Sequence, residues 1–229
     1  MSIQRALVIG AGGGVGKATA SALTEAGADV LASGRERDAT DADQVAGLLA
    51  EADPDLVVIA AGARPHMAPI DEQSWESFSE TWNVDVKIAF EVGRAALARP
   101  LRPGSTVLIM SSGAGLAGSP RSGGYAGAKR MQMFMAEYLQ RAADARKLGI
   151  RFVALAQRQL LAGTAIGEAA AAAYGAESGE SVEDYMQRRF PVPLDPAGVA
   201  GAILSIASGD EHPDATVLTV TADGLEVIS

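Results

Sequence analysis

A glycine-rich turn at residues 10–16, which reads GAGGGVG, constrains the fold more than any other part of the sequence. The apolar run before it, residues 3–9, predicts a buried parallel strand, and residues 17–26 after it predict a helix that ends at Gly27. A strand, a glycine turn and a helix in this order place backbone N–H groups and a helix dipole around an anion, typically the pyrophosphate of a dinucleotide. The opening of the chain therefore predicts an α/β fold with a dinucleotide site.

The spacing of the glycines identifies the kind of turn. The pattern Gly-x-Gly-x-x-Gly fails when it starts at Gly10, because Val15 takes its last position. The pattern Gly-x-x-x-Gly-x-Gly fits through Gly10, Gly14 and Gly16. The alternative, a flexible surface turn, is disfavoured by the position directly after a first strand. The residues of this turn expected to contact the cofactor are Gly10, Gly12, Gly14 and Val15.

A second motif combines a serine, a tyrosine and a lysine near the middle of the chain. Tyr125 follows Ser112 by thirteen residues, and Lys129 stands four residues further on. Residues four apart on a helix lie on the same face, so the lysine ammonium is expected beside the phenol. A free phenol has a pKa of about 10, and a nearby cation favours the phenolate, which suits an acid–base catalyst at neutral pH. Ser112 is expected to hydrogen-bond the substrate oxygen.

Together the two motifs resemble those of the short-chain dehydrogenase/reductase family. The glycine spacing and the Ser…Tyr-x-x-x-Lys motif occur in the family's order, and the resemblance covers nearly all of the 229 residues. It implies a doubly wound parallel sheet in three layers (a Rossmann fold), a nicotinamide cofactor, and catalysis by Ser112, Tyr125 and Lys129. Tyr125 and Lys129 would also contact the cofactor.

Strand-like and helix-like runs alternate along the chain, as in a parallel sheet covered on both faces. Strands are predicted near residues 3–9, 28–32, 55–60, 104–110, 150–156 and 215–220, and helices near 14–26, 41–51, 73–98, 123–147 and 196–208. We interpret residues 1–229 as a single dinucleotide-binding domain, because no linker-like segment interrupts them. Within it, residues 160–193 predict two short helices and a loop, and the family resemblance identifies them as a cap over the substrate.

The connection after the second predicted strand is unusually short. Only residues 34–41 separate that strand from the next helix. A complete helix and a further strand do not fit in this length. We therefore expect an abbreviated crossover that leaves the adenine pocket more open than usual.

The end of the second strand predicts which nicotinamide cofactor is used. An acidic side chain there hydrogen-bonds the 2′-hydroxyl of NAD, whereas a basic one accommodates the 2′-phosphate of NADP. By the family pattern this position falls on Gly34, which has no carboxylate, and Arg35 follows with a guanidinium suited to phosphate. NADP is therefore predicted in preference to NAD, with Ser33 as a further hydrogen-bonding group. Gly13 argues for NAD, because NADP-preferring members often carry a basic residue there.

Two further segments resemble parts of the family's adenosine site. Asp38 and Ala39 resemble the segment in which an aspartate lies beside the adenine ring. Ala61 and Gly62 resemble an Asn-Ala-Gly segment that passes the adenosine ribose, although Ala60 replaces the asparagine. All but Ala60 are expected to contact the cofactor.

At two places the chain departs from the family pattern. The asparagine of the long central helix aligns with Asp85, whose negative charge would hold Lys129 firmly but oppose formation of a phenolate. We include Asp85 among the candidate catalytic residues. After the fifth strand, where the family has Pro-Gly beside the nicotinamide, the chain has Gln157 and Arg158, so the turn must differ.

Composition argues against several other classes of function. The chain has no cysteine, and its two histidines, His66 and His212, are far apart, so neither a disulfide nor a metal site is predicted. A net charge of −9 disfavours nucleic acid and anionic membranes as partners. Because no signal peptide or long apolar span is present, a cytoplasmic protein is expected. Trp75 and Trp82 are interpreted as packing residues.

The sequence favours one function and leaves two alternatives. The favoured function is an oxidoreductase that transfers a hydride between NADP(H) and a small-molecule carbonyl or secondary alcohol, with Tyr125 as acid or base. The alternatives are a dinucleotide-binding regulatory or partner protein with weak or no turnover, and an isomerase or lyase that uses the cofactor transiently. The family commonly pairs the helix near 123–147 across a twofold axis, so a homodimer or homotetramer is expected.

Overall fold

The computed structural model describes residues 3–228. The strands in this range are β1 (Arg5–Ile9), β2 (Asp29–Ser33), β3 (Leu56–Ile59), β4 (Thr106–Ser112), β5 (Arg151–Gln157), β6 (Val217–Thr221) and β7 (Gly224–Val227). They form one sheet in the order β2-β1-β3-β4-β5-β6-β7, in which β7 alone runs antiparallel to its neighbour.

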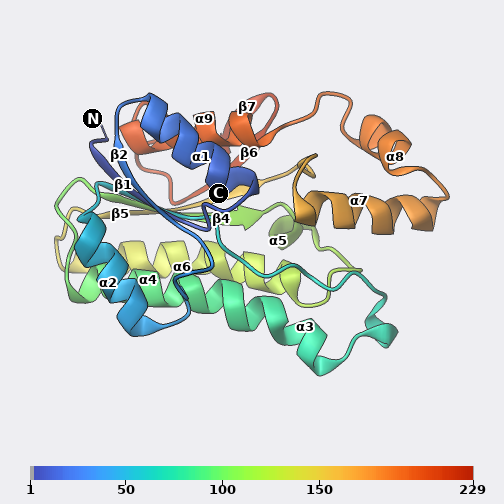
Figure 1. Ribbon diagram of the computed structural model, residues 1–229, viewed down its shortest axis with the longest axis horizontal. Helices are drawn as coiled ribbons and strands as arrows, with labels where there is room; N and C mark the ends of the chain where they lie inside the picture. The colour runs from blue at the N-terminus through green and yellow to red at the C-terminus, as the bar shows by residue number, and fades with distance from the viewer. Residues whose placement is uncertain (1–2, 229) are drawn as a thin grey trace.

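Helices cover both faces of this sheet. The α-helices in the described range are α1 (Gly14–Glu25), α2 (Ala42–Ala52), α3 (Trp75–Thr81), α4 (Lys87–Ala98), α5 (Ala114–Ala117), α6 (Tyr125–Ala145), α7 (Ala165–Ser178), α8 (Val182–Arg189) and α9 (Pro196–Ser208). Figure 1 shows α1 and α9 on one side of the sheet and α2, α4 and α6 on the other. The predicted doubly wound, three-layer α/β fold is confirmed.

Alternation of side chains along the strands explains the two outer layers. In β1, Leu7 and Ile9 belong to an apolar cluster with residues of α2, α4 and α6, whereas Ala6 and Val8 belong to a second cluster with residues of α1 and α9. Successive residues of a strand point to opposite faces, so both sets must be apolar. β3 is likewise buried at every position. The continuous apolar runs of the sequence are thus the central strands of a sheet covered on both faces.

The abbreviated crossover is also confirmed. Residues 34–41 form turns that lead from β2 directly into α2, and α2 leads to β3 on the other side of β1. Asp41 starts α2 by accepting hydrogen bonds from the backbone N–H groups of Asp43 and Gln44. β2 pairs with β1 alone and forms an edge of the sheet.

The long helix predicted near residues 73–98 is interrupted, which corrects the prediction. A short 3₁₀ turn (η1, Ile70–Glu72) precedes α3, and a π-helical turn (η2, Trp82–Val86) separates α3 from α4. A π turn accommodates one extra residue within a helix and often occurs at a functional site. Asp85 lies in this turn and is fully buried. The periodicity of apolar residues does not reveal such an inserted residue.

α7 and α8 project from one end of the molecule (Figure 1). They are the two short helices expected within residues 160–193. The hydroxyl groups of Tyr174 in α7 and Ser119, in the loop after α5, hydrogen-bond at 2.8 Å and tie α7 to the body of the fold. Within residues 3–228, every helix falls short of the length or the apolar character that a bilayer-spanning segment requires.

Candidate active site

The carboxyl ends of the parallel strands meet at one edge of the sheet, where α/β proteins of this type bind ligands. Gly10 follows β1 with φ of +91°, and a side chain there would collide with the backbone of Ala61 in the loop after β3. At Gly16, in the first turn of α1, a side chain would collide with the carbonyl oxygen of Gly10. The glycine spacing is therefore set by two close backbone approaches that join the turn, α1 and the β3 loop.

A cavity of about 900 Å³ lies beside the glycine turn. A side chain at Gly12 or Gly13 would meet no other atom within 4 Å, so the surface of the turn is open at these residues. An open glycine surface at the N terminus of α1 fits a pyrophosphate. The residues predicted to bind the cofactor that line this cavity are Gly10, Gly12, Arg35, Asp38, Ala39, Ala61 and Gly62.

Five other residues predicted to contact the cofactor lie outside the lining of this cavity. Gly14 faces the threonine that precedes α7. Val15 is partly buried against the cluster on the α1 side of the sheet, and the side chain of Ser33 is buried. Tyr125 lines a second cavity, described below. Lys129 is buried beside it in an ion pair with Asp85. Some of the residues predicted to bind the cofactor thus line the cavity, and the others lie behind its wall or at the second cavity.

The loop after β2 brings charged side chains to the cavity. Arg35 is exposed on the cavity wall, and Arg37 pairs with Glu51 at 2.9 Å. Glu36 folds back so that its Oε1 accepts a hydrogen bond of 2.6 Å from the backbone N–H of Gly34. Glu36 is absent from the residues predicted from the sequence, because only this turn brings it back to the end of β2.

Asp38 shapes the rim of the same cavity. Its Oδ1 accepts hydrogen bonds from the backbone N–H of Thr40 at 2.9 Å and from the Thr40 hydroxyl at 2.8 Å. These two bonds, the backbone one first, lower the pKa of Asp38. The backbone N–H of Asp38 in turn donates to Oε1 of Gln44 at 2.8 Å. Asp38 therefore holds the loop against α2, with Ala39 buried beneath it.

A second cavity, of about 450 Å³, lies between the Ser–Tyr pair and residues 160–193. Ser112 ends β4 and Tyr125 begins α6, and both line this cavity. The Oγ of Ser112 accepts a hydrogen bond of 3.2 Å from the backbone N–H of Ala114, which leaves the hydroxyl proton to be donated elsewhere. The aromatic residues of the segment 160–193 that complete the lining are Tyr174, Tyr185 and Phe190.

Lys129 and Asp85 form an ion pair of 3.0 Å between Nζ and Oδ2, and both side chains are almost completely buried. Lys129 also donates to the carbonyl oxygen of Met110 at 3.3 Å, and its Nζ lies 5.3 Å from the centre of the Tyr125 ring. Burial alone would lower the pKa of Lys129, but the Asp85 carboxylate, with a further contribution from Tyr125, raises it above its ordinary value. The ammonium therefore stays charged beside the phenol, balanced by a carboxylate.

The Asp85 carboxylate is fixed by its surroundings. Its Oδ1 accepts a hydrogen bond of 2.7 Å from the backbone N–H of Ala63, and the Asp85 carbonyl accepts one of 3.2 Å from Nε2 of Gln132. A side chain at Gly62 would come within 2.8 Å of Oδ2, so the loop after β3 passes close to the carboxylate. The π-helical turn thus places Asp85 between this loop and α6.

Gln157 and Arg158 continue the sheet instead of forming an open turn. The carbonyl of Gln157, the last residue of β5, accepts a hydrogen bond of 2.7 Å from Gly113, and the N–H of Arg158 donates to Val220 at 3.1 Å. The Arg158 side chain pairs with Glu226 at 3.5 Å. The chain therefore stays hydrogen-bonded to both neighbouring strands where it enters the second cavity.

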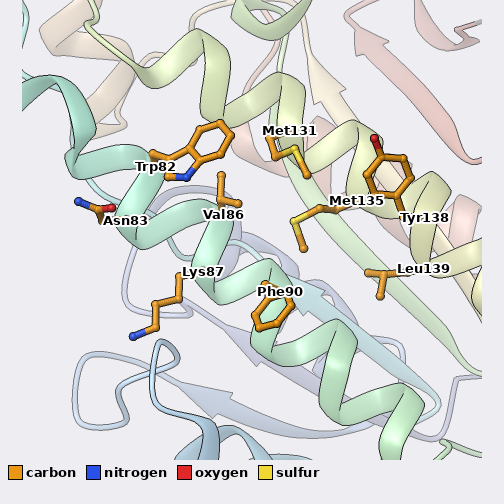
Figure 2. Close-up of a pocket in the computed structure, with 9 residues that line it drawn as sticks. All are labelled: Trp82, Asn83, Val86, Lys87, Phe90, Met131, Met135, Tyr138 and Leu139. Carbon is orange, nitrogen blue, oxygen red and sulfur yellow. The ribbon is translucent and has the colours of Figure 1, made fainter.

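An apolar groove of about 700 Å³ lies between α4 and α6 and shares no lining residue with the two cavities. Figure 2 shows Trp82 and Phe90 on one side and Met135 and Tyr138 on the other. Trp82, Phe90 and Tyr138 are 48%, 51% and 55% exposed. Trp75 is 73% exposed and stacks on Phe78 with 5.9 Å between the ring centres, so it packs at the surface and not in the core.

Comparison with known proteins gives consistent matches. The sequence model of the NAD dependent epimerase/dehydratase family matches residues 6–156, more than half of the chain. A curated relative, an uncharacterized short-chain type dehydrogenase/reductase of Sinorhizobium fredii, is 30% identical over 142 residues. That alignment covers 54% of this chain and 57% of the relative, so the chain spans little more than half the length of this relative.

Solved structures show the same fold. A short chain dehydrogenase from Mycobacterium avium aligns with a TM-score of 0.71 and 23% identity, over 99% of this chain and 84% of its own. Sorbitol-6-phosphate 2-dehydrogenase from Erwinia amylovora aligns with a TM-score of 0.80 and 23% identity, over 95% and 98%. An NAD⁺-bound xylitol dehydrogenase aligns with a TM-score of 0.76 and 18% identity, over 95% and 96%. From the family match and the curated relative, we conclude that this chain belongs to the short-chain dehydrogenase/reductase family.

Proposed function

We propose that this protein is an oxidoreductase that transfers a hydride between NADP(H) and a small-molecule carbonyl or secondary alcohol. The observation that carries the proposal is that Ser112 and Tyr125 line one cavity, with the Lys129 ammonium 5.3 Å from the centre of the phenol ring. The glycine-turn cavity, which fits a dinucleotide, opens at the same edge of the sheet. A hydrogen-bond donor, a proton donor and a cation at the end of a dinucleotide site are the groups that carbonyl reduction requires.

The chain's own residues move the proton and hold the substrate. In the reducing direction, Tyr125 donates its phenolic proton to the substrate oxygen as negative charge develops there. The Ser112 hydroxyl donates a hydrogen bond to the same oxygen and fixes its position. In the oxidising direction the Tyr125 phenolate accepts the proton. Hydride transfer is the chemistry that the nicotinamide supplies when bound, and the protein contributes position and charge.

The dinucleotide would be held by groups on both sides of the glycine turn. Backbone N–H groups at Gly12, Gly14 and Val15, at the start of α1, suit the pyrophosphate. Lys129 would contact the ribose next to the nicotinamide. The residues that suit the adenosine half are Ser33, Arg35, Asp38, Ala39, Ala61 and Gly62.

We also interpret residues 160–193 as the substrate-selecting cap of a single domain. Tyr174, Tyr185 and Phe190 give an aromatic wall to the second cavity, which Tyr125 and Ser112 also line. Such a wall suits the apolar part of a small molecule. The direct test is a panel of ketones and aldehydes offered to the purified protein with NADPH, followed by the loss of absorbance of the reduced cofactor. Oxidation of NADPH with at least one of them is expected.

One observation favours a second candidate, a dinucleotide-binding regulatory or partner protein. Asp85 neutralises Lys129, so the phenol faces a weaker positive field than a lone ammonium would give. Binding of NADPH without turnover of any carbonyl in the panel would support this candidate over the oxidoreductase.

NADP preference is expected to depend on Arg35. The unmodified protein should bind NADPH more tightly than NADH, because the exposed guanidinium on the cavity wall can pair with a 2′-phosphate. Arg35→Ala should remove most of this difference, weakening NADPH binding about tenfold with little change for NADH. Fluorescence titration of both reduced cofactors measures the ratio, and equal or tighter NADH binding by the unmodified protein would contradict the preference.

A homodimer or homotetramer is expected, with the groove between α4 and α6 at the contact. Exposed aromatic side chains grouped along one apolar groove are typical of a buried interface. Phe90→Glu should shift the protein to monomer, because it places a charge in the centre of the apolar surface. Light scattering at micromolar concentration measures the mass. The matched control is Glu137→Gln on α6, which is outside the groove lining. A monomeric mass for the unmodified protein would refute the prediction.

A further inference from the structure

The cavity beside the glycine turn contains an acidic group that the sequence does not place there. Gly34 directly follows β2 and has no side chain, yet the Oε1 of Glu36 lies 2.6 Å from its backbone nitrogen. A Cβ added at Gly34 would lie 2.7 Å from the Oε2 of Glu36. The Glu36 carboxylate thus fills the space that a side chain at residue 34 would enter.

Local interactions keep this carboxylate in its charged form. The hydrogen bond from the Gly34 N–H is the main cause of a lowered pKa of Glu36, followed by a bond to the Glu36 backbone and by the charge of Arg37. Because Glu36 and Arg35 both line the cavity, adjacent residues present opposite charges to it. No other residue is needed to hold the carboxylate at the end of β2.

We propose that Glu36, and not the residue at position 34, supplies the acidic group that reads the 2′ position of the adenosine ribose, in opposition to Arg35. The proposal rests on the dinucleotide binding proposed above. A 2′-hydroxyl can donate a hydrogen bond to the carboxylate, as it does to an acidic side chain at the end of the second strand in NAD-binding folds. A 2′-phosphate meets a like charge and a Gly34 N–H that is already occupied, so it must displace Glu36.

Arg35 and Glu36 therefore set the choice of cofactor as a balance. Arg35 favours the 2′-phosphate and Glu36 opposes it, so Glu36 reduces the NADP preference that Arg35 confers. The quantity that isolates Glu36 is the ratio of the dissociation constants of NADH and NADPH. This ratio should rise when the carboxylate is removed and fall when the guanidinium is removed.

The experiment is a titration of NADH, NADPH and adenosine 2′,5′-bisphosphate against the unmodified protein and two variants. Glu36→Gln keeps the shape of the side chain and removes its charge. It should raise the ratio of the NADH and NADPH dissociation constants about tenfold and tighten the binding of the bisphosphate. This is the effect expected when a charged group beside the phosphate is lost. Glu36→Ala also removes the oxygen that would accept a hydrogen bond from the 2′-hydroxyl, so it should weaken NADH binding several-fold as well. The matched control is Glu76→Gln, since the Glu76 carboxylate is likewise hydrogen-bonded to its own backbone but lies outside the cavity lining.

Two negative results are distinguishable. If both cofactors bind the unmodified protein and the ratio in Glu36→Gln equals that in Glu76→Gln, the role of Glu36 is refuted while dinucleotide binding stands. If no dinucleotide binds the folded, unmodified protein, the proposed function fails and the inference fails with it. Circular dichroism of Glu36→Ala confirms that a changed ratio reflects binding and not unfolding, since the side chain is exposed.

Discussion

Tyr125→Phe is expected to lower turnover of any accepted carbonyl by about a hundredfold or more, the loss expected when a positioned acid is removed. The substitution deletes one hydroxyl and keeps the ring, which is buried at the start of α6. Folding and NADPH binding should therefore remain close to those of the unmodified protein. Steady-state rates, together with a cofactor titration on the same preparation, separate loss of chemistry from loss of binding.

A matched control for this experiment is Tyr138→Phe. Tyr138 lies on the same helix but faces the groove between α4 and α6 and not the second cavity (Figure 2). Removing its hydroxyl should leave the rate within a factor of about two, since the group is remote from the reacting atoms. Unchanged turnover in Tyr125→Phe would show that the catalytic assignment is wrong.

Lys129→Met is expected to destabilise the protein by about 3–5 kcal/mol, because it leaves the buried Asp85 carboxylate without its cation. Methionine keeps most of the volume, so the loss reports the charge and not a cavity. The double variant Lys129→Met/Asp85→Asn should recover much of the stability, since neither charge is then buried and the asparagine oxygen can still accept the hydrogen bond from the Ala63 N–H. Urea denaturation of the single and double variants measures the loss of stability and its recovery.

The same ion pair makes stability depend on pH in a defined direction. The folded pKa of Lys129 is raised above that of an unfolded lysine, about 10.4. Its contribution is therefore fully present below that pH and is lost as pH rises through the higher folded value. Asp85→Asn should weaken this alkaline dependence, and by removing a negative charge near the phenol it should move the activity profile to lower pH. A destabilisation in Lys129→Met that persists in the double variant would contradict a role for the pair.

Local patterns were sufficient to predict much of the fold and of the site. Gly10 and Gly16 could be found from spacing because each sits where two backbone segments approach too closely for a side chain. Ser112 and Tyr125 line the same cavity because Ser112 ends the parallel strand β4 and Tyr125 begins the long helix α6 that follows. The order of the elements dictates this arrangement. The abbreviated crossover followed from length alone, because a helix and a strand need more residues than the sequence provides.

Features that depend on a side chain turning back, or on an inserted residue, were not predictable in the same way. Glu36 reaches the end of β2 only because residues 34–36 reverse direction, and no periodicity encodes that reversal. The π-helical turn at Asp85 depends on how α3 and α4 pack against the loop after β3. The partial exposure of Trp82 was not predictable from the sequence either, because large apolar residues are usually buried.

The short route from β2 to β3 also affects when the site can form as the chain is synthesised. β1, β2 and β3 are neighbours in the sheet and lie within residues 5–59, so their contacts close short loops, which form faster than long ones. Apart from Val84 and Ile88, the residues that line the cavity beside the glycine turn lie within or next to these three strands, so the contacts that shape most of this cavity are close in sequence, whereas Ser112 and Tyr125 come later in the chain. A truncated chain that ends after α4 should protect the backbone amides of β1, which has a partner strand on each side, better than those of β2 and β3, which are then each paired on one side only.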